Sequence, residues 1–168
     1  MNNLVENALK FAFKKHENVN RNVTNIPSIS HVLEVYGYLK GTFGYNNRDE
    51  VLASAILHDT VEDTDTTIEE IKENFGLVVA HYVSELTKDR EDEARIGKEE
   101  YLNKSLLMMS HEALLIKLVD ILMNIQDNPT EEMLERTTNN LEFLSVSRKD
   151  MNAQHLNVLH AVMDLLPI

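Results

Sequence analysis

A histidine and four carboxylates lie close together in the segment 57–65, which reads LHDTVEDTD. If a helix runs through this segment, Glu62 lies one turn beyond His58, and Asp63 lies one turn beyond Asp59. Carboxylates gathered in this way repel one another, and a bound metal ion is the usual relief. The spacing therefore indicates a metal site with imidazole and carboxylate ligands.

The same carboxylates are also compatible with a solvated helix end that precedes the next helix. The residues before them, 51–57, are nearly all apolar and predict a buried helix. A buried helix would carry His58 and Asp59 into surroundings where polar groups need partners. This context favours the metal site, and the solvated helix end stays open as the alternative.

A further carboxylate, Asp120, lies within the segment 113–122, which is apolar nearly all round and predicts a central helix. An unpaired buried aspartate is costly, so Asp120 needs a positively charged partner. Lys117 stands three residues earlier and can supply one through an ion pair. Ion pairing with Lys117 and ligation of a metal ion are therefore competing interpretations of Asp120.

Two residue types limit the metal chemistry. The chain has no cysteine, so a metal ion can be held only by histidines and carboxylates, and a disulfide framework is excluded. The chain has seven histidines, and most of them are predicted to be surface or satisfied core residues. This group comprises His16, His81, His111, His155 and His160.

Composition and charge restrict the partners. With 168 residues, 43% of them hydrophobic, the chain can bury a core of its own. A net charge of −12 opposes binding to long nucleic acids. The absence of a long apolar run predicts no membrane segment and no signal peptide, and so a cytoplasmic protein. A small anionic ligand would need a bound cation or a local basic cluster, and the oligomeric state is not indicated.

Apolar residues recur at spacings of three and four, with few glycines and prolines between them, which predicts an all-α fold. A capping box at Thr66-Thr67-Ile68-Glu69 starts one helix, and Asn128 is the predicted cap of another. The charged segment 88–100 is expected to be a solvated loop or a frayed helix start. We expect a single compact multi-helix domain over residues 1–168. The other predicted helices cover about 3–15, 29–43, 49–58, 78–87, 101–109, 112–126, 130–146 and 150–166.

Three separated segments resemble one family in the same order. They are Ile29-Ser30-His31, the segment LHDTVEDTDTT with His58 and Asp59, and the segment LLIKLVDILMNIQD with Asp120. The chain resembles the HD-domain metal-dependent phosphohydrolases, and more closely the hydrolase domain of RelA/SpoT-type alarmone enzymes. The resemblance runs from about residue 8 to residue 127 and includes Lys15-His16.

This resemblance implies a set of site residues. One divalent ion, usually manganese in this branch although other divalent metals occur, would be bound by four ligands. They are His31, His58, Asp59 and Asp120. Glu62 and Asp63 match the acidic pair assigned to catalysis, and Asn124 matches an asparagine that contacts the substrate. From their positions, Arg21 and Lys117 are candidate contacts to the phosphates, and Lys14 or Lys15 is either a further contact or a solvated helix end.

Two departures from the family pattern concern the nucleotide pocket. Ser28 stands where family members commonly have tyrosine, and Gln126 stands where they have arginine. The resemblance implies hydrolysis of guanosine 3′,5′-bis(diphosphate), abbreviated ppGpp, at its 3′-diphosphate. Two alternatives remain: a phosphohydrolase for another phosphorylated nucleotide, and a catalytically silent domain that binds a nucleotide or a metal as a sensor.

Overall fold

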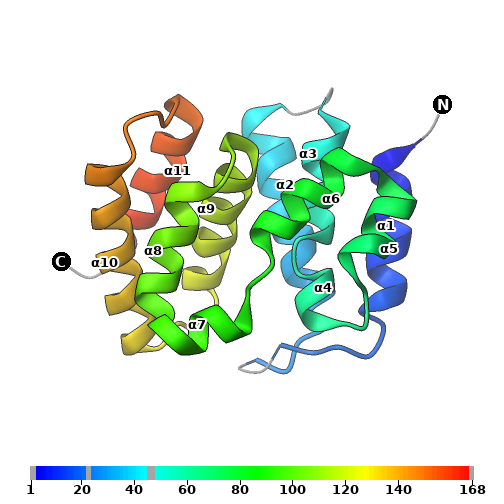
Figure 1. Cartoon of the computed structure of the whole chain (residues 1–168), viewed down its shortest axis with the longest axis horizontal. Helices are drawn as coiled ribbons and strands as arrows, with labels where there is room; N and C mark the ends of the chain where they lie inside the picture. The colour runs from blue at the N-terminus through cyan, green and yellow to red at the C-terminus, as the bar shows by residue number, and fades with distance from the viewer. Residues whose placement is uncertain (1–2, 22–23, 45–47, 167–168) are drawn as a thin grey trace. The chain divides into compact units, whose positions relative to one another are not determined.

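The computed structural model describes residues 3–21, 24–44 and 48–166, and their regular structure is helical (Figure 1). The predicted all-α class is confirmed. No helix in the described ranges is long and apolar enough to cross a lipid bilayer. The helices are α1 (Leu4–Lys15), α2 (Ile29–Phe43), α3 (Asp49–Leu57), α4 (Thr60–Asp63), α5 (Ile68–Phe75), α6 (Leu77–Leu86), α7 (Arg90–Ile96), α8 (Lys98–Met108), α9 (His111–Gln126), α10 (Glu131–Ser147) and α11 (Ala153–Met163).

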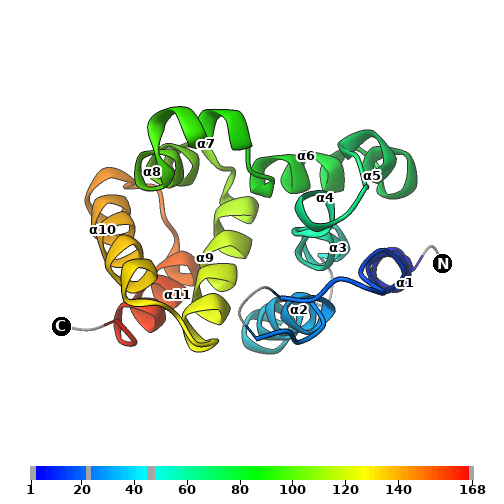
Figure 2. The ribbon, with the colours of Figure 1, turned by 90° about the horizontal axis from the view of Figure 1, so that it is seen from below.

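The chain divides into two compact units, the first ending at Thr87 and the second beginning at Lys88. The first unit contains α1 to α6, and the second contains α7 to α11. Figure 2 shows the same helices from a second direction. The extent of a single domain over residues 1–168 stays a prediction, and each unit is described by itself below.

Helix α3 forms the centre of the first unit, where α1, α2 and α6 pack against it. Every residue from Val51 to Leu57 is buried. Ile56 and Leu57 are fully buried, and each such side chain contributes about 2 kcal/mol to folding. This apolar helix ends directly at His58, so the core fixes the place where the polar segment begins.

The polar segment after α3 stays helical through Asp63 and then becomes extended. His58 and Asp59 keep right-handed helical dihedral angles, and α4 follows from Thr60. The amide of Asp63 donates to the carbonyl oxygen of Asp59 at 2.9 Å. The backbone turns to an extended conformation at Thr64. Asp63 therefore follows Asp59 by one turn, as the spacing predicts.

The start of α5 differs by one residue from the predicted capping box. Thr67 is the N-cap, and its hydroxyl accepts a hydrogen bond from the amide of Glu70 at 3.2 Å. Thr66 is buried and its hydroxyl contacts that of Thr64 instead. The assignment to Thr66 and Glu69 was wrong, because adjacent threonines are both good caps and the sequence does not distinguish them.

In the second unit, α9 packs against α11, and α10 packs against α8. Ten of the sixteen residues of α9 are buried, which confirms a central helix for the segment 112–126. Asp120 is among them, with a relative exposure of 4%. Helix α9 therefore carries a buried carboxylate among its apolar residues.

Two details of the second unit differ from the prediction. The charged segment 88–100 contains α7, which Asp89 caps by accepting from the amides of Glu91 and Asp92. Asp92 also pairs with Arg95 and Lys104, and α7 has no buried residue. The N-cap of α10 is Thr130, whereas Asn128 adopts a left-handed conformation with φ of +51°.

Candidate metal and phosphohydrolase site

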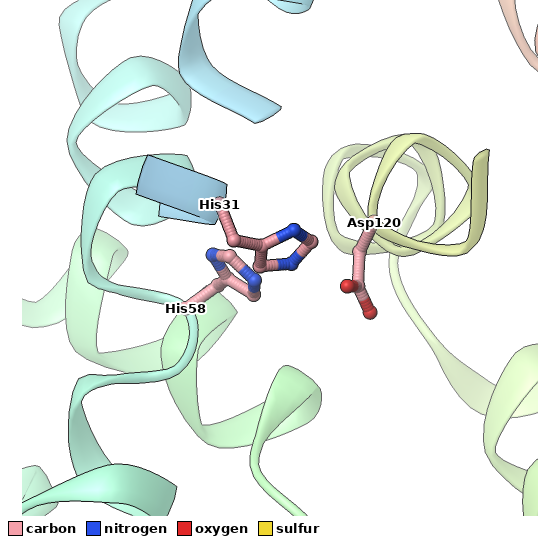
Figure 3. Close-up of side chains that lie close together, drawn as sticks. All are labelled: His31, His58 and Asp120. Carbon is pink, nitrogen blue, oxygen red and sulfur yellow. The ribbon is translucent and has the colours of Figure 1, made fainter. Parts of the chain in front are cut away.

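Two histidines of the first unit lie against each other below the protein surface. His31 belongs to the first turn of α2, and His58 follows α3. They are 3% and 2% exposed, and their ring centroids are 5.4 Å apart (Figure 3). Because α2 packs against α3, the two rings come together although they are 27 residues apart in sequence.

The hydrogen bonding of His58 defines which nitrogen is available for ligation. Its Nδ1 lies 2.8 Å from the carbonyl oxygen of Ala55, to which it donates. In the neutral ring this bond places the proton on Nδ1 and leaves a lone pair on Nε2. A backbone carbonyl that orients the ring in this way is the usual support of a metal-ligating histidine.

Both imidazoles direct Nε2 toward the same carboxylate oxygen. Oδ2 of Asp59 lies 3.2 Å from Nε2 of His58 and 3.8 Å from Nε2 of His31. Two ligand atoms that share an octahedral ion at about 2.1 Å each lie about 3 Å apart. Lone pairs on nitrogen and carboxylate oxygen repel unless a proton or a cation lies between them. The three residues therefore fit a divalent cation.

The predicted catalytic pair follows on α4. Glu62 is half-buried, and Asp63 keeps part of its side chain in solvent. Partial desolvation, followed by the negative charge of Asp59, raises the pKa of the Asp63 carboxyl above its usual value. His16 and His58 act in the opposite direction and favour the ionised form. Asp63 thus lies within the electrostatic field of the candidate ligands.

The remaining predicted residues with defined partners lie on α9 in the second unit. Oδ2 of Asp120 accepts from Nζ of Lys117 at 2.7 Å, and its Oδ1 accepts from Nδ2 of Asn124 at 2.5 Å. The ion pair at three residues' spacing is therefore present. Asp120, which Figure 3 also draws, is a candidate metal ligand that offers one oxygen atom.

Three residues of the predicted nucleotide pocket have less defined surroundings. Arg21 lies in the loop between α1 and α2, where its amide donates to the carbonyl of Ile26 at 2.8 Å. Ser28 is buried at the start of α2, and Gln126 is exposed as the last residue of α9. The contacts of these residues with a nucleotide stay predictions.

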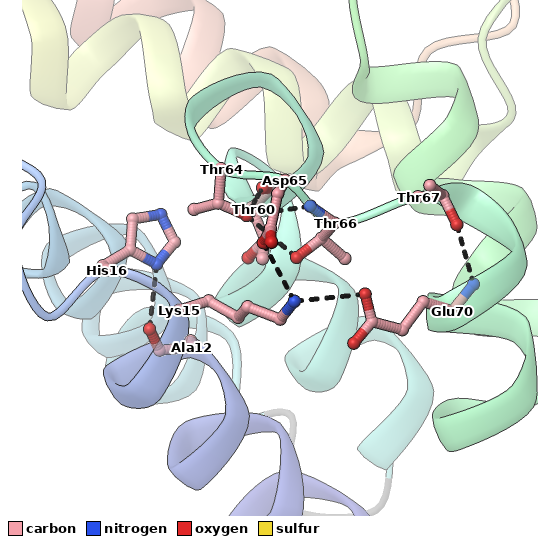
Figure 4. Close-up of polar contacts among 9 residues, drawn as sticks. All are labelled: Ala12, Lys15, His16, Thr60, Thr64, Asp65, Thr66, Thr67 and Glu70. Atoms are coloured by element: carbon pink, nitrogen blue, oxygen red, sulfur yellow. Dashed lines mark hydrogen bonds and ion pairs between the residues drawn. The ribbon is translucent and has the colours of Figure 1, made fainter.

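His16 lies closer to the candidate site than the sequence indicates. His16 is buried, as predicted for a core residue, with its Nδ1 2.9 Å from the carbonyl oxygen of Ala12 (Figure 4). It also influences the pKa of Asp63 across 47 residues of sequence. The family resemblance at Lys15-His16 was the signal for this proximity, because periodicity alone gives only a helix end.

Comparison with known proteins supports the same interpretation. The family model described as HD domain matches residues 8–146, which is most of the chain. The chain belongs to the HD-domain family. The match begins in α1 and ends in α10, so it includes residues of both compact units. Dependence on a divalent metal is a property of this family, and the predicted membership is confirmed.

Curated relatives indicate which branch of the family the chain resembles. A zebrafish protein named guanosine-3′,5′-bis(diphosphate) 3′-pyrophosphohydrolase MESH1 is 38% identical over 120 residues, which cover 71% of this chain and 66% of the relative. The corresponding Xenopus tropicalis protein is 38% identical over 131 residues, covering 74% and 69%. A pyrophosphohydrolase of Aquifex aeolicus is also 38% identical, over 73% of this chain but 17% of its own length.

A solved structure agrees with these relatives. It belongs to a metazoan orthologue of SpoT, described as hydrolysing ppGpp and acting in starvation responses. Its TM-score is 0.76 at 27% sequence identity, with 96% of this chain and 94% of that chain covered. The similarity to the RelA/SpoT hydrolase branch, seen in three short segments, thus extends over nearly the whole chain.

Proposed function

We propose that this chain hydrolyses ppGpp and releases its 3′-diphosphate. The convergence of two imidazole Nε2 atoms on one oxygen of Asp59, one turn before Glu62 and Asp63, carries this proposal. Relatives named for the same reaction support the choice of substrate. The reaction adds one water molecule across the bond between the 3′ oxygen and phosphorus, giving GDP and pyrophosphate.

The proposed metal ligands are two histidines and two aspartates. His31, His58 and Asp59 would provide three of them within the first unit, and Asp120 the fourth from α9. We propose manganese as the preferred ion. A divalent ion held by these groups would supply the positive charge that lowers the pKa of a bound water and polarises a phosphate oxygen.

Glu62 and Asp63 have the proposed roles of accepting and delivering protons. Hydrolysis requires a group that takes a proton from the attacking water and a group that protonates the departing 3′ oxygen. Each of the two carboxylates follows a proposed ligand by three or four residues, which places both next to the metal site without requiring them as ligands. The raised pKa of Asp63 suits a carboxyl that exchanges protons during the reaction.

The proposed substrate contacts are basic or amide side chains. Asn124 and Lys117 lie on α9, where both donate to Asp120. The family resemblance for Asn124, and the position of Lys117 in the sequence, make them the proposed contacts to phosphate oxygens. Arg21 would contribute from the loop before α2. The chain's net charge of −12 makes such local positive groups necessary for a polyanionic nucleotide. We propose that the protein acts in the cytoplasm on this small-molecule substrate.

The test is incubation of the purified protein with Mn²⁺ and a panel of nucleotides phosphorylated at the 2′, 3′ or 5′ position. We expect ppGpp to be converted to GDP and pyrophosphate, measured by anion-exchange chromatography. The variant Asp59→Asn provides the control, because it removes the carboxylate charge while keeping the side-chain shape. Hydrolysis that persists unchanged in Asp59→Asn would contradict the proposed site.

A second candidate function is hydrolysis of another phosphorylated nucleotide, and Ser28 and Gln126 favour it. These residues replace a tyrosine and an arginine that are common in the family, which points toward another phosphorylated nucleotide. The same panel distinguishes the two, since this alternative requires faster hydrolysis of a nucleotide other than ppGpp. A silent sensor would bind ppGpp in calorimetry and form no product with any member of the panel.

A further inference from the structure

Lys15, the last residue of α1, connects that helix to two distant carboxylates. Its Nζ donates to Oδ1 of Asp65 at 3.1 Å and to Oε2 of Glu70 at 3.2 Å (Figure 4). Asp65 lies between α4 and α5, and Glu70 belongs to the first turn of α5. The side chain of Lys15 is only 20% exposed, so it lies along the protein surface instead of extending into solvent.

The loop that carries Asp65 is joined to α4 by threonine hydroxyls. Thr64 donates its hydroxyl proton to the carbonyl oxygen of Thr60 at 2.6 Å. The same oxygen of Thr64 lies 2.8 Å from the hydroxyl of Thr66 and accepts from the amide of Thr66 at 3.2 Å. Because Thr64 uses its only proton on Thr60, the hydroxyl of Thr66 must be the donor of their contact.

These contacts form a continuous path from α1 to the carboxylates of α4. Lys15 holds Asp65, the neighbouring Thr64 holds the first residue of α4, and α4 carries Glu62 and Asp63. Helix α4 has only four residues, which is too short for its own hydrogen bonds to fix its position. External contacts must therefore set where its carboxylates lie.

The ion pairs of Lys15 are better suited to positioning than to stability or phosphate binding. Ion pairs close to solvent contribute little to the free energy of folding. The hydrogen bonds that Lys15 donates to Asp65 and then to Glu70 raise the pKa of Lys15, so the ammonium stays charged over the working pH range. Two carboxylates already surround this single positive charge, which leaves little attraction for a phosphate.

We propose that Lys15 is a positioning residue that, through Asp65 and Thr64, fixes α4 so that Glu62 and Asp63 face the substrate. This inference rests on the proposed function. It replaces the expectation that Lys15 contacts a phosphate or is a solvated helix end.

The test compares three variants of the full chain in the Mn²⁺ assay. Lys15→Met removes the charge and keeps the length of the side chain, and Lys15→Arg restores both ion pairs. Lys10→Met is the matched control, because Lys10 pairs with Glu6 at 2.6 Å on the same helix. We expect Lys15→Met to lower kcat roughly tenfold with KM within about twofold of the wild type, since small displacements of reacting groups slow catalysis. Lys15→Arg should recover most of the rate.

A second measurement does not depend on the substrate. Hydrogen exchange of the backbone amides in residues 60–66 should be faster in Lys15→Met and in Thr64→Val than in the wild type. Lys10→Met should exchange at the wild-type rate there. If the wild type fails to hydrolyse ppGpp while this exchange pattern is found, the proposed substrate is wrong and the role of Lys15 in holding α4 stands.

Other outcomes would overturn the inference. A higher KM with unchanged kcat in Lys15→Met would make Lys15 a phosphate contact. Equal losses in Lys10→Met and Lys15→Met would indicate a general effect of charge on α1. Unchanged exchange in residues 60–66 would show that Lys15 does not hold α4, whatever the activity of the variant.

Discussion

Nε2 of His58 lies 3.2 Å from Oδ2 of Asp59, the next residue in the chain. The hydrogen bond from Nδ1 of His58 to the Ala55 carbonyl holds the imidazole in this orientation. The two atoms are held at a separation that suits two ligands of one cation. Metal affinity at the proposed site would therefore depend on the conformation at the end of α3 as well as on the identity of the ligands.

The first prediction concerns metal binding. His58→Gln should abolish binding of Mn²⁺, because the variant lacks the imidazole nitrogen directed at Asp59. His81→Gln is the control, since His81 is exposed on α6 and pairs with Glu85. Calorimetric titration of Mn²⁺ into both variants provides the measurement. Undiminished binding in His58→Gln would remove His58 from the ligand set.

The second prediction separates catalysis from metal binding. Glu62→Gln and Asp63→Asn should each lower kcat by about 100-fold or more, the usual contribution of a general acid or base. Their Mn²⁺ content should equal that of the wild type. Glu69→Gln, which changes the charge of the exposed face of α5, should have wild-type kcat. Loss of metal together with activity would assign the affected residue to the ligands.

The third prediction concerns base specificity. Because Ser28 and Gln126 replace residues common in the family, we expect weak preference for guanine over adenine in matched substrates. Gln126→Arg should lower KM for ppGpp, since position 126 is exposed and can accept a longer side chain without repacking. Ser28 is buried, so replacement there would disturb the start of α2. Strong guanine preference in the wild type would contradict this expectation.

The fourth prediction concerns the contribution of the metal to substrate binding. Without a cation, the carboxylates of Asp59, Glu62 and Asp63 would face the phosphates directly and repel them. A non-hydrolysable ppGpp analogue should therefore bind more weakly after chelation, by roughly tenfold or more. Calorimetry with and without Mn²⁺ measures the difference. Equal affinity in both states would place the phosphates away from this cluster.

The fifth prediction is a pH dependence of stability that arises from His155. Burial lowers the pKa of His155 below its usual value near 6.5. Between this lowered pKa and about 6.5 the unfolded chain binds more protons than the folded chain, so stability decreases as the pH falls through that window. His155→Gln can keep the capping contact with the amide of Asn152 and should reduce this decrease. Urea unfolding of the wild type and of His155→Gln at pH 7.5 and at pH 5.5 measures how much the free energy of unfolding falls between the two pH values. An equal fall in both proteins would exclude His155 as the source.

Much of the helical framework could be predicted because its causes are local. The helix Ile29–Phe43 follows from apolar spacing and from Gly44, which takes the left-handed conformation with φ of +61° that favours glycine. Helix α7 was predicted only as a loop or a frayed helix start, because it begins at a cap formed by Asp89 and has no buried apolar face. Periodicity detects buried faces and does not detect a helix that lacks one.

The candidate site could be predicted in composition but only partly in arrangement. The approach of His31 to Asp59 depends on the packing of α2 on α3, and the order of motifs in the family was the signal for it. The contact between Lys15 and Asp65 spans 50 residues and involves ordinary surface residue types. No spacing rule links such residues, so this contact required the structure.

The hydrogen bonds from Lys117 and Asn124 to Asp120 have a consequence for the protein without metal. The ammonium of Lys117 serves as an internal counter-ion, so the negative charge of Asp120 is balanced inside α9 before any ion binds. With this charge balance, the buried carboxylate does not require a metal cation for the second unit to fold. Under the proposed ligand set, a divalent ion would have to compete with the ammonium of Lys117 for Oδ2 of Asp120.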